Sequence, residues 1–267
     1  MDIRSLLKVM VDREASDLYL TVDAPPVYRI HGVTQRTDAP PFANEQLEAL
    51  ALALMRGQQR GEFEEKMEMN LALYYKELGR FRVNIFRQKG NVGLVFRLIK
   101  AEIQTVEELQ LPPIIKDIAM TKRGLVLVVG ATGSGKSTTL AAMIDHRNTI
   151  APGHIVTVED PIEFVHQHKK CIITQREVGF DTHSFQNALK NTLRQAPDVI
   201  LIGEIRDTET MEAAITFAET GHLCLGTLHS NNANQAIERI MNFFRSNGTL
   251  RSISSFRSTS APSSPSG

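Results

Sequence analysis

Apolar positions follow two different periods along the amino-terminal part of the chain. Helical spacing predicts an amphipathic helix over residues 2–14, and a second helix is expected over Glu45–Met55 with Asn44 as its N-cap. Alternation of period two predicts strands at 18–22, from Val27 onward, and at 71–76, 80–87 and 92–99. These elements predict a small α+β domain over residues 1–99.

The pattern changes after residue 99. Residues 100–113 have no clear period and end in a Pro-Pro step, so we expect a linker there. Over residues 114–244, apolar strands alternate with helical stretches. The strands are expected at 125–129, 155–158, 199–202 and 223–228, and the helices at 136–149, 184–195, 208–220 and 232–244. This alternation predicts an α/β fold, a mostly parallel sheet with helices on both faces.

Residues 245–267 have a different composition. They are rich in serine, their only charged residues are arginines, and few of them are apolar. Such a segment cannot offset its ordering entropy by burial, so we expect it to be disordered.

Composition excludes several classes of function. The chain has 30 basic and 30 acidic residues and a formal net charge of zero, which disfavours bulk attraction to nucleic acid or to an anionic membrane. It has no Trp and four Tyr, which disfavours a stacking platform for a single-stranded nucleic acid. No long apolar run occurs, so we expect neither membrane insertion nor an export signal.

The strongest chemical signal is the stretch GATGSGKST, which follows the apolar strand 125–129 and opens a helix. It satisfies the P-loop pattern G-x-x-x-x-G-K-[ST], in which glycines let backbone N–H groups turn towards phosphate oxygens. We expect Lys136 to neutralise the β and γ oxygens of ATP and Ser137 to ligate Mg²⁺. The predicted nucleotide-binding residues are Gly130, Ala131, Thr132, Gly133, Ser134, Gly135, Lys136, Ser137 and Thr138.

Acidic residues end two further strands. Glu204 follows the apolar run VILIG, at the strand end where open α/β sheets hold ligands, and is the candidate Walker B ligand of Mg²⁺. Glu159, Asp160 and Glu163 follow the strand 155–158, and a carboxylate there can orient or deprotonate the attacking water. Spacing alone does not separate Glu159 from Glu163, and it leaves a solvated acidic turn equally open.

Histidines bracket the predicted strand GHLCLGTLH. We expect His229, at its carboxyl end, to face the nucleotide, where it can donate a hydrogen bond to the γ-phosphate. His222, at the other end, is interpreted as a solvated or capping residue.

Arginines cluster on adjacent strands of the first domain. Even spacing places two of them on one face of a strand. The cluster is either a solvated basic face or a set of arginine fingers that reach a neighbouring subunit's phosphates. From the residues alone the solvated face is favoured. The cluster comprises Arg80, Arg82, Arg87 and Arg97.

Four stretches in this order resemble the motifs of the secretion ATPases of the PilT class. GATGSGKSTT, VTVEDPIEFVH, RQAPDVILIGEIRD and GHLCLGTLHSNNANQAIERI correspond to the Walker A motif, Asp box, Walker B motif and His box of that class. The resemblance continues in LLKVMVDREASDLYLTVDAPP and GRFRVNIFRQKG, and it covers residues 1–244. It is strongest towards the PilU type, notably in HQHKKCIITQREVGFDT.

This resemblance implies a PAS-like amino-terminal domain and a RecA-like P-loop core. It also implies a homo-hexameric ATPase at the cytoplasmic face of the inner membrane, which uses ATP and Mg²⁺ to drive type IV pilus retraction and twitching motility. The implied partners are a PilT-like paralogue and the inner-membrane platform protein of the pilus machine, with no nucleic acid.

The resemblance also implies roles for individual residues. Lys136 and Ser137 would bind nucleotide and Mg²⁺, Glu163 would be the catalytic carboxylate, Glu204 the Walker B acid, and His229 would complete the site. The candidates for trans-acting arginine fingers then become Arg80, Arg82 and Arg97.

After Phe244 the chain departs from the class, which continues into a proline-containing turn and a helical carboxyl-terminal domain. We interpret this break as a truncated or frameshifted reading frame, with a natural short variant as the alternative. Two functions therefore stay open. One is an ATP-hydrolysing motor, and the other is a nucleotide-binding assembly component that does not hydrolyse ATP.

Overall fold

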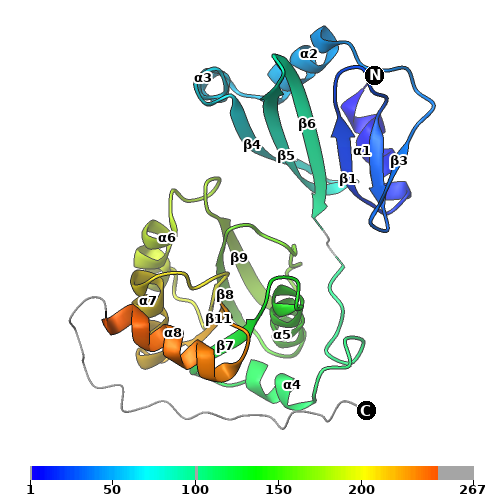
Figure 1. The fold of residues 1–267 in the computed structure, drawn as a ribbon. Coiled ribbons are helices and arrows are strands. Elements are labelled where there is room, and N and C mark those ends of the chain that lie inside the picture. Colours follow the sequence, from blue (N-terminus) through cyan, green and yellow to red (C-terminus); the bar gives the residue numbers. More distant parts are fainter. Residues whose placement is uncertain (1, 100–101, 246–267) are drawn as a thin grey trace. The chain divides into compact units, whose positions relative to one another are not determined.

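The computed structural model describes residues 2–99 and 102–245 (Figure 1). The chain divides into two compact units. The first consists of Met1–Glu102 with Glu163–Val165, and the second of Ile103–Ile162 with His166–Gly267. The division at Glu102 falls inside the expected linker, whereas the separate grouping of residues 163–165 was not expected. The segment 246–267, for which we expect disorder, lies outside the described residues.

The first unit is built on an antiparallel six-stranded sheet, in the order β3-β2-β1-β6-β5-β4. Its strands are β1 (Ala15–Leu20), β2 (Val27–Ile30), β3 (Val33–Arg36), β4 (Glu68–Tyr75), β5 (Gly79–Gln88) and β6 (Asn91–Ile99). Its helices are α1 (Ile3–Asp12), α2 (Asn44–Leu54) and α3 (Gly57–Lys66). At the turn between β5 and β6, Lys89 and Gly90 have φ angles of 50° and 80°, as a tight hairpin requires.

Alternation along β5 separates the two faces of this sheet. Phe81 is fully buried in a core that it forms with Leu7 of α1 and Leu47 of α2. Arg80 and Arg82 alternate with the core residues of the same strand and are only partly buried. Because successive strand residues point to opposite faces, the helices cover one face and the arginines lie on the other.

The first unit differs from the sequence-based prediction in three places. Asn44 is not an N-cap, because α2 begins at Asn44 and Ala43 occupies the cap position. The Asn44 side chain instead accepts a hydrogen bond from the backbone N–H of Val92, at 3.1 Å, and so joins α2 to β6. Helix α3 was not predicted, since Phe63 is its one buried residue and an apolar stripe is missing. Strand β3 was also missed, because all four of its residues are exposed.

The second unit contains a five-stranded sheet in the order β7-β11-β10-β8-β9, with every neighbouring pair parallel. Its strands are β7 (Gly124–Gly130), β8 (Gly153–Glu159), β9 (Cys171–Glu177), β10 (Val199–Ile202) and β11 (Leu223–His229). Its helices are α4 (Ile114–Ala119), α5 (Lys136–Ile150), α6 (Phe185–Thr192), α7 (Thr208–Glu219) and α8 (Ala233–Arg245), with a short 3-10 helix η1 (Leu193–Gln195).

Helices cover both faces of this parallel sheet (Figure 1). Val199 and Leu201 of β10 pack with Leu140 of α5, whereas Ile200 and Ile202 pack with α6, α7 and α8 residues. Double coverage explains why β10 is apolar at every position. The predicted α/β fold is confirmed, although α4 and the edge strand β9 were missed.

The second unit contains two free cysteines, Cys171 and Cys224, and both are buried. Burial raises the pKa of Cys224 to about 12.

Among the described helices, none combines the length and the apolar character needed to span a membrane.

Candidate nucleotide site

The carboxyl ends of three neighbouring strands bring the predicted nucleotide motifs together. β7 leads into the P-loop, β10 ends just before Glu204, and β11 lies between them and ends at His229. Strands β7 and β11 are in register, so that His229 pairs with Gly130. Open parallel sheets bind ligands outside the carboxyl ends of their strands. We call this edge of the sheet, which carries Lys136, Glu204 and His229, the nucleotide edge.

The P-loop folds around Lys136. Gly133 and Gly135 have φ angles of 77° and 85°, which glycine adopts without strain, and Gly135 is the N-cap of α5. The buried Lys136 donates from Nζ to the carbonyl oxygens of Gly130, at 3.0 Å, and Ala131, at 2.8 Å. An ammonium group has three donors, so one remains for a phosphate oxygen. The loop therefore has the form of a phosphate-binding helix start.

Glu204 lies at the centre of a charged network. Its Oε1 is 3.3 Å from Nε2 of His229, within ion-pair reach when the imidazole is protonated. Its Oε2 accepts a hydrogen bond from Nε of Arg206 at 2.7 Å, and this bond is the main cause that raises the pKa of Arg206. Two residues singled out from sequence are thus brought into contact, together with one that was not.

The acidic segment after β8 reaches this network through Asp160. Nη1 of Arg206 donates to Oδ2 of Asp160 at 3.4 Å. Glu159 Oε1 accepts a hydrogen bond from Thr157 Oγ1 at 2.6 Å. A Cβ atom on Gly203 would lie 3.0 Å from the Cα of Glu159, so a larger residue at Gly203 would press the end of β10 against this segment.

Further side chains that sequence reasoning missed fix the strand ends. Thr227, buried in β11, donates from Oγ1 to the carbonyl of Gly203 at 2.6 Å, and Arg239 of α8 donates to the carbonyl of His229 at 3.0 Å. Both residues lie in the stretch that resembles the His box, but sequence reasoning assigned them no role, because each acts on a residue that is remote in sequence. Arg206 had a detectable signal, since a base that follows a strand-end acid at i+2 can reach it.

Glu163 and Glu159 lie in different surroundings. Glu163 is exposed and belongs to the segment Glu163–Val165, which groups with the first unit. Glu159 is half-buried at the end of β8, in the second unit. The structure therefore distinguishes two acids that spacing could not separate, and each can be tested by itself.

In the first unit, Arg97 is held by a buried acid that the sequence did not single out. Asp17 is 3% exposed, and its Oδ1 accepts a hydrogen bond from Arg97 Nε at 2.8 Å. Nε of Arg29 lies 3.9 Å from Oδ2 of the same carboxylate. Arg82 is the cross-strand neighbour of Arg97. Arg82, Arg97, Asp17 and Arg29 thus follow one another across four strands, and we call this set the arginine row.

Arg87 has a different environment from the arginine row. Its Nη1 donates to Oε1 of Glu48 at 2.9 Å, and this bond lowers the pKa of Glu48. Its guanidinium also lies 5.5 Å from the centre of the Phe63 ring. Arg87 therefore joins β5 to α2 and α3.

His222 and His166, also in the second unit, contact groups outside the nucleotide edge. His222 Nδ1 lies 3.2 Å from the carbonyl oxygen of Phe217, near the end of α7, which fits a capping residue. His166 is 8% exposed, and burial lowers its pKa to about 4, with the charge of Asp145 opposing this and that of Lys169 adding to it. His166 is therefore neutral at physiological pH.

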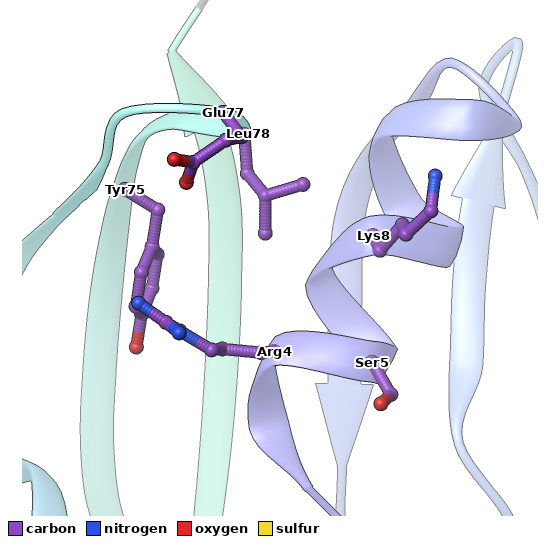
Figure 2. Close-up of a pocket in the computed structure, with 6 residues that line it drawn as sticks. All are labelled: Arg4, Ser5, Lys8, Tyr75, Glu77 and Leu78. Carbon is purple, nitrogen blue, oxygen red and sulfur yellow. The ribbon is translucent and has the colours of Figure 1, made fainter.

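A separate pocket of about 250 Å³ lies in the first unit, between α1 and the turn that joins β4 to β5 (Figure 2). The Arg4 guanidinium lies 5.0 Å from the centre of the Tyr75 ring, a cation–π contact, and Lys8 pairs with Asp12 at 2.9 Å. Its lining residues are Arg4, Ser5, Lys8, Tyr75, Glu77 and Leu78. None of the residues predicted to bind nucleotide lines this pocket.

The donors at the nucleotide edge suit Mg²⁺. Ser137 offers a hydroxyl in the first turn of α5, and Glu204 offers a carboxylate at the end of β10. Mg²⁺ prefers such hard oxygen ligands and is usually held by one or two of them together with substrate phosphates. In residues 2–99 and 102–245, no group of three His, Cys, Asp or Glu could hold a metal ion. The Ser137 hydroxyl and the Glu204 carboxylate fit a cation that binds together with nucleotide phosphates.

The fold and the nucleotide edge define a class of protein. The P-loop leads from β7 into α5, and β11 lies between β7 and β10. The same strand order occurs in RecA-like P-loop NTPase cores. A family model described as "Type II/IV secretion system protein" matches residues 2–255. The chain belongs to this family.

Curated and solved relatives agree with this assignment. The type IV pilus ATPase PilU of Pseudomonas aeruginosa is 56% identical over 244 residues, which cover 91% of this chain and 64% of PilU. The type IV pilus retraction ATPase PilT of the same organism is 48% identical, over 91% of this chain and 71% of PilT. The chain therefore spans about two thirds of the length of these relatives.

Solved structures support the same fold. The crystal structure of the pilus retraction motor PilT with bound ADP has a TM-score of 0.86 and 45% identity, over 91% of this chain and 71% of that chain. The ATPase DotB of Legionella pneumophila has a TM-score of 0.78 and 26% identity, over 91% of this chain and 69% of DotB. The PilT/PilU-type resemblance and the RecA-like core expected from the sequence are confirmed.

Proposed function

We propose that this chain is an ATP-hydrolysing motor of the type IV pilus machine, which powers pilus retraction and twitching motility. The observation that carries the proposal is the placement of β11. It sets His229 opposite Gly130 in register and 3.3 Å from Glu204, so that the P-loop and the acidic strand end flank one site. The names of the relatives PilU and PilT, both pilus ATPases, support the pilus assignment.

In this proposal the nucleotide edge binds ATP. The P-loop N–H groups and the remaining Lys136 donor contact phosphate oxygens, and His229 detects the γ-phosphate through a hydrogen bond. Ser137 and Glu204 hold Mg²⁺, which neutralises charge that develops on the phosphates. Glu163 orients or deprotonates the attacking water. A bound ADP in the related PilT structure supports nucleotide binding at this fold.

The arginines of the first unit complete the proposed site from another copy of the chain. Arg80, Arg82 and Arg97 act as fingers that stabilise transition-state charge on a neighbouring subunit's nucleotide. This requires a closed ring, and we propose a homo-hexamer at the cytoplasmic face of the inner membrane. Its partners are a PilT-like paralogue and the inner-membrane platform protein of the pilus.

Steady-state ATP hydrolysis by the purified chain tests this function, with light scattering on the same samples to give the mass. Turnover by an oligomer that is lost in Lys136→Ala supports the motor. Lys190→Ala, which removes an exposed lysine of α6, is the matched control and should keep full turnover. Nucleotide binding without turnover would favour the non-hydrolysing assembly component. If the wild-type chain bound no nucleotide, both functions would be wrong.

A further inference from the structure

Arg206 joins the two acidic segments of the nucleotide edge. Its Nε donates to Oε2 of Glu204 at 2.7 Å, and its Nη1 donates to Oδ2 of Asp160 at 3.4 Å. The other oxygen of Glu204 is 3.3 Å from His229 Nε2. Both Glu204 oxygens are therefore engaged, one by the imidazole and one by the guanidinium. The Arg206 side chain therefore contacts both the segment after β8 and the segment after β10.

The backbone around Arg206 is fixed on both sides. The buried Ile205 donates its backbone N–H to the carbonyl of Thr227 at 2.9 Å. Asp207 is the N-cap of α7 and accepts a hydrogen bond from the Thr210 N–H at 2.8 Å. Arg206 therefore starts from a rigid turn, although its side chain is 51% exposed. A planar guanidinium on a fixed turn can hold two carboxylates in one arrangement.

We propose that Arg206 is a positioning residue that acts through Glu204, orienting this carboxylate and competing with the divalent cation for it. The inference rests on the proposed function, because it concerns how the same site uses Mg²⁺. Two effects of the guanidinium follow from its contacts. It keeps the carboxylate pointed in one direction, and its positive charge lowers the affinity of the carboxylate for a second cation.

Replacing Arg206 by Gln should therefore strengthen the binding of Mg²⁺ but slow the hydrolysis of ATP. Without the guanidinium, the half-saturating concentration of Mg²⁺ should fall about three- to tenfold, because a competing charge next to the carboxylate is gone. Turnover at saturating Mg²⁺ should fall about tenfold or more, because the carboxylate is no longer oriented. A residue that only stabilised the fold would not make Mg²⁺ bind more tightly.

Mg²⁺ titration of the full chain with a fluorescent ATP analogue, N-methylanthraniloyl-ATP, measures the first effect without hydrolysis. The variants are Arg206→Gln, Arg206→Lys, Glu204→Gln and the double variant Arg206→Gln/Glu204→Gln. Arg194→Gln is the matched control, because Arg194 is exposed and precedes the amino end of β10, away from the nucleotide edge. Thermal unfolding of every variant verifies that it is folded.

Four results are expected. Arg206→Gln lowers the half-saturating Mg²⁺ concentration, Arg206→Lys restores it because the charge is retained, and Arg194→Gln leaves it unchanged. In the Glu204→Gln background, Arg206→Gln adds less than about a twofold change, since the two residues act as one unit.

The inference would be overturned if Arg206→Gln left the half-saturating Mg²⁺ concentration unchanged. It would also be overturned if Arg206→Gln changed this concentration as much in the Glu204→Gln background as in the wild-type chain. The test separates this inference from the proposed function. If the wild-type chain bound the analogue but did not hydrolyse ATP, the motor assignment would fail while the Mg²⁺ titration still decided the role of Arg206.

Discussion

The nucleotide edge and the arginine row hold their charged side chains in different ways. At the nucleotide edge, Lys136 and Glu204 follow strand ends and His229 is the last residue of β11, and the order of the strands brings them together. In the arginine row, Arg97 lies within β6 and is held by the buried side chain of Asp17. One site is supported mainly by backbone, and the other by a single side chain.

The nucleotide edge and the arginine row should tolerate substitutions differently. At the nucleotide edge, backbone bonds from Ile205 to Thr227 and from Gly203 to Val158 fix the strand ends independently of any one charged group. In the arginine row, Arg97 and Arg29 share one carboxylate, so a single substitution disturbs both. Substitutions of charged residues at the nucleotide edge should therefore affect catalysis alone. Substitution of the shared carboxylate in the arginine row should affect both catalysis and stability.

The largest expected effect belongs to the arginine row. Arg82→Ala and Arg97→Ala should each lower ATP turnover about 10³-fold, because an arginine finger stabilises transition-state charge. Steady-state hydrolysis measures this, with nucleotide binding expected to stay near the wild-type level. Arg36→Ala is the matched control, because Arg36 is an exposed arginine of the same sheet.

Mixing variants tests whether these arginines act on another subunit. A mixture of Arg82→Ala with Lys136→Ala chains creates some sites with an intact P-loop on one subunit and an intact arginine on the next. Turnover of the mixture should exceed that of either variant alone. A mixture no more active than its components would place Arg82 on its own subunit's nucleotide and contradict the proposed ring arrangement.

The next largest effect separates the two acids after β8. Glu163→Gln should lower turnover about 10²-fold or more with nucleotide binding retained, as expected when a general base is removed. Glu159→Gln should have a smaller effect, because the Glu159 carboxylate already accepts a hydrogen bond from Thr157. Full activity of Glu163→Gln combined with loss in Glu159→Gln would reverse this assignment.

Asp17→Asn tests the dependence of the arginine row on one acid. It should lower the free energy of unfolding by about 2–3 kcal/mol, because a buried carboxylate is lost while Arg97 and Arg29 stay in place. It should also lower turnover, since Arg97 is no longer held. Denaturant unfolding measures the first effect, and Asp12→Asn, which removes an exposed i,i+4 pair with Lys8, should cost under about 0.5 kcal/mol. Equal costs for the two variants would contradict a special role for Asp17.

The same comparison explains what the sequence could predict. The P-loop was found because its residues are contiguous and follow an apolar strand, and the strands of the parallel sheet were found because both faces are covered. The contact between Glu204 and His229 depends on strand order, which periodicity does not give. The Asp17–Arg97 bond joins residues 80 positions apart, so no local pattern marks it.

The elements that were missed have a common physical reason. Strand β9 is at the edge of its sheet, and polar residues such as Gln175 and Arg176 interrupt its apolar pattern. Strand β3 is also an edge strand, and helix α3 buries only Phe63. Elements with little buried surface leave little trace in the hydrophobic pattern.

The smallest expected effect is the dependence of the free energy of unfolding on pH that the buried His166 of the second unit causes. Its pKa is about 4 in the folded chain against an ordinary value of 6.5, so the unfolded chain binds a proton more readily. Stability should therefore fall as pH decreases from about 6.5 towards 4, by about 1–2 kcal/mol between pH 7 and pH 5 from this group. Denaturant unfolding at both pH values measures the loss. His166→Phe should remove this part of the pH dependence, whereas His183→Asn, at an exposed histidine of the same unit, should keep it. An identical pH dependence in His166→Phe and in the wild-type chain would show that other groups cause it.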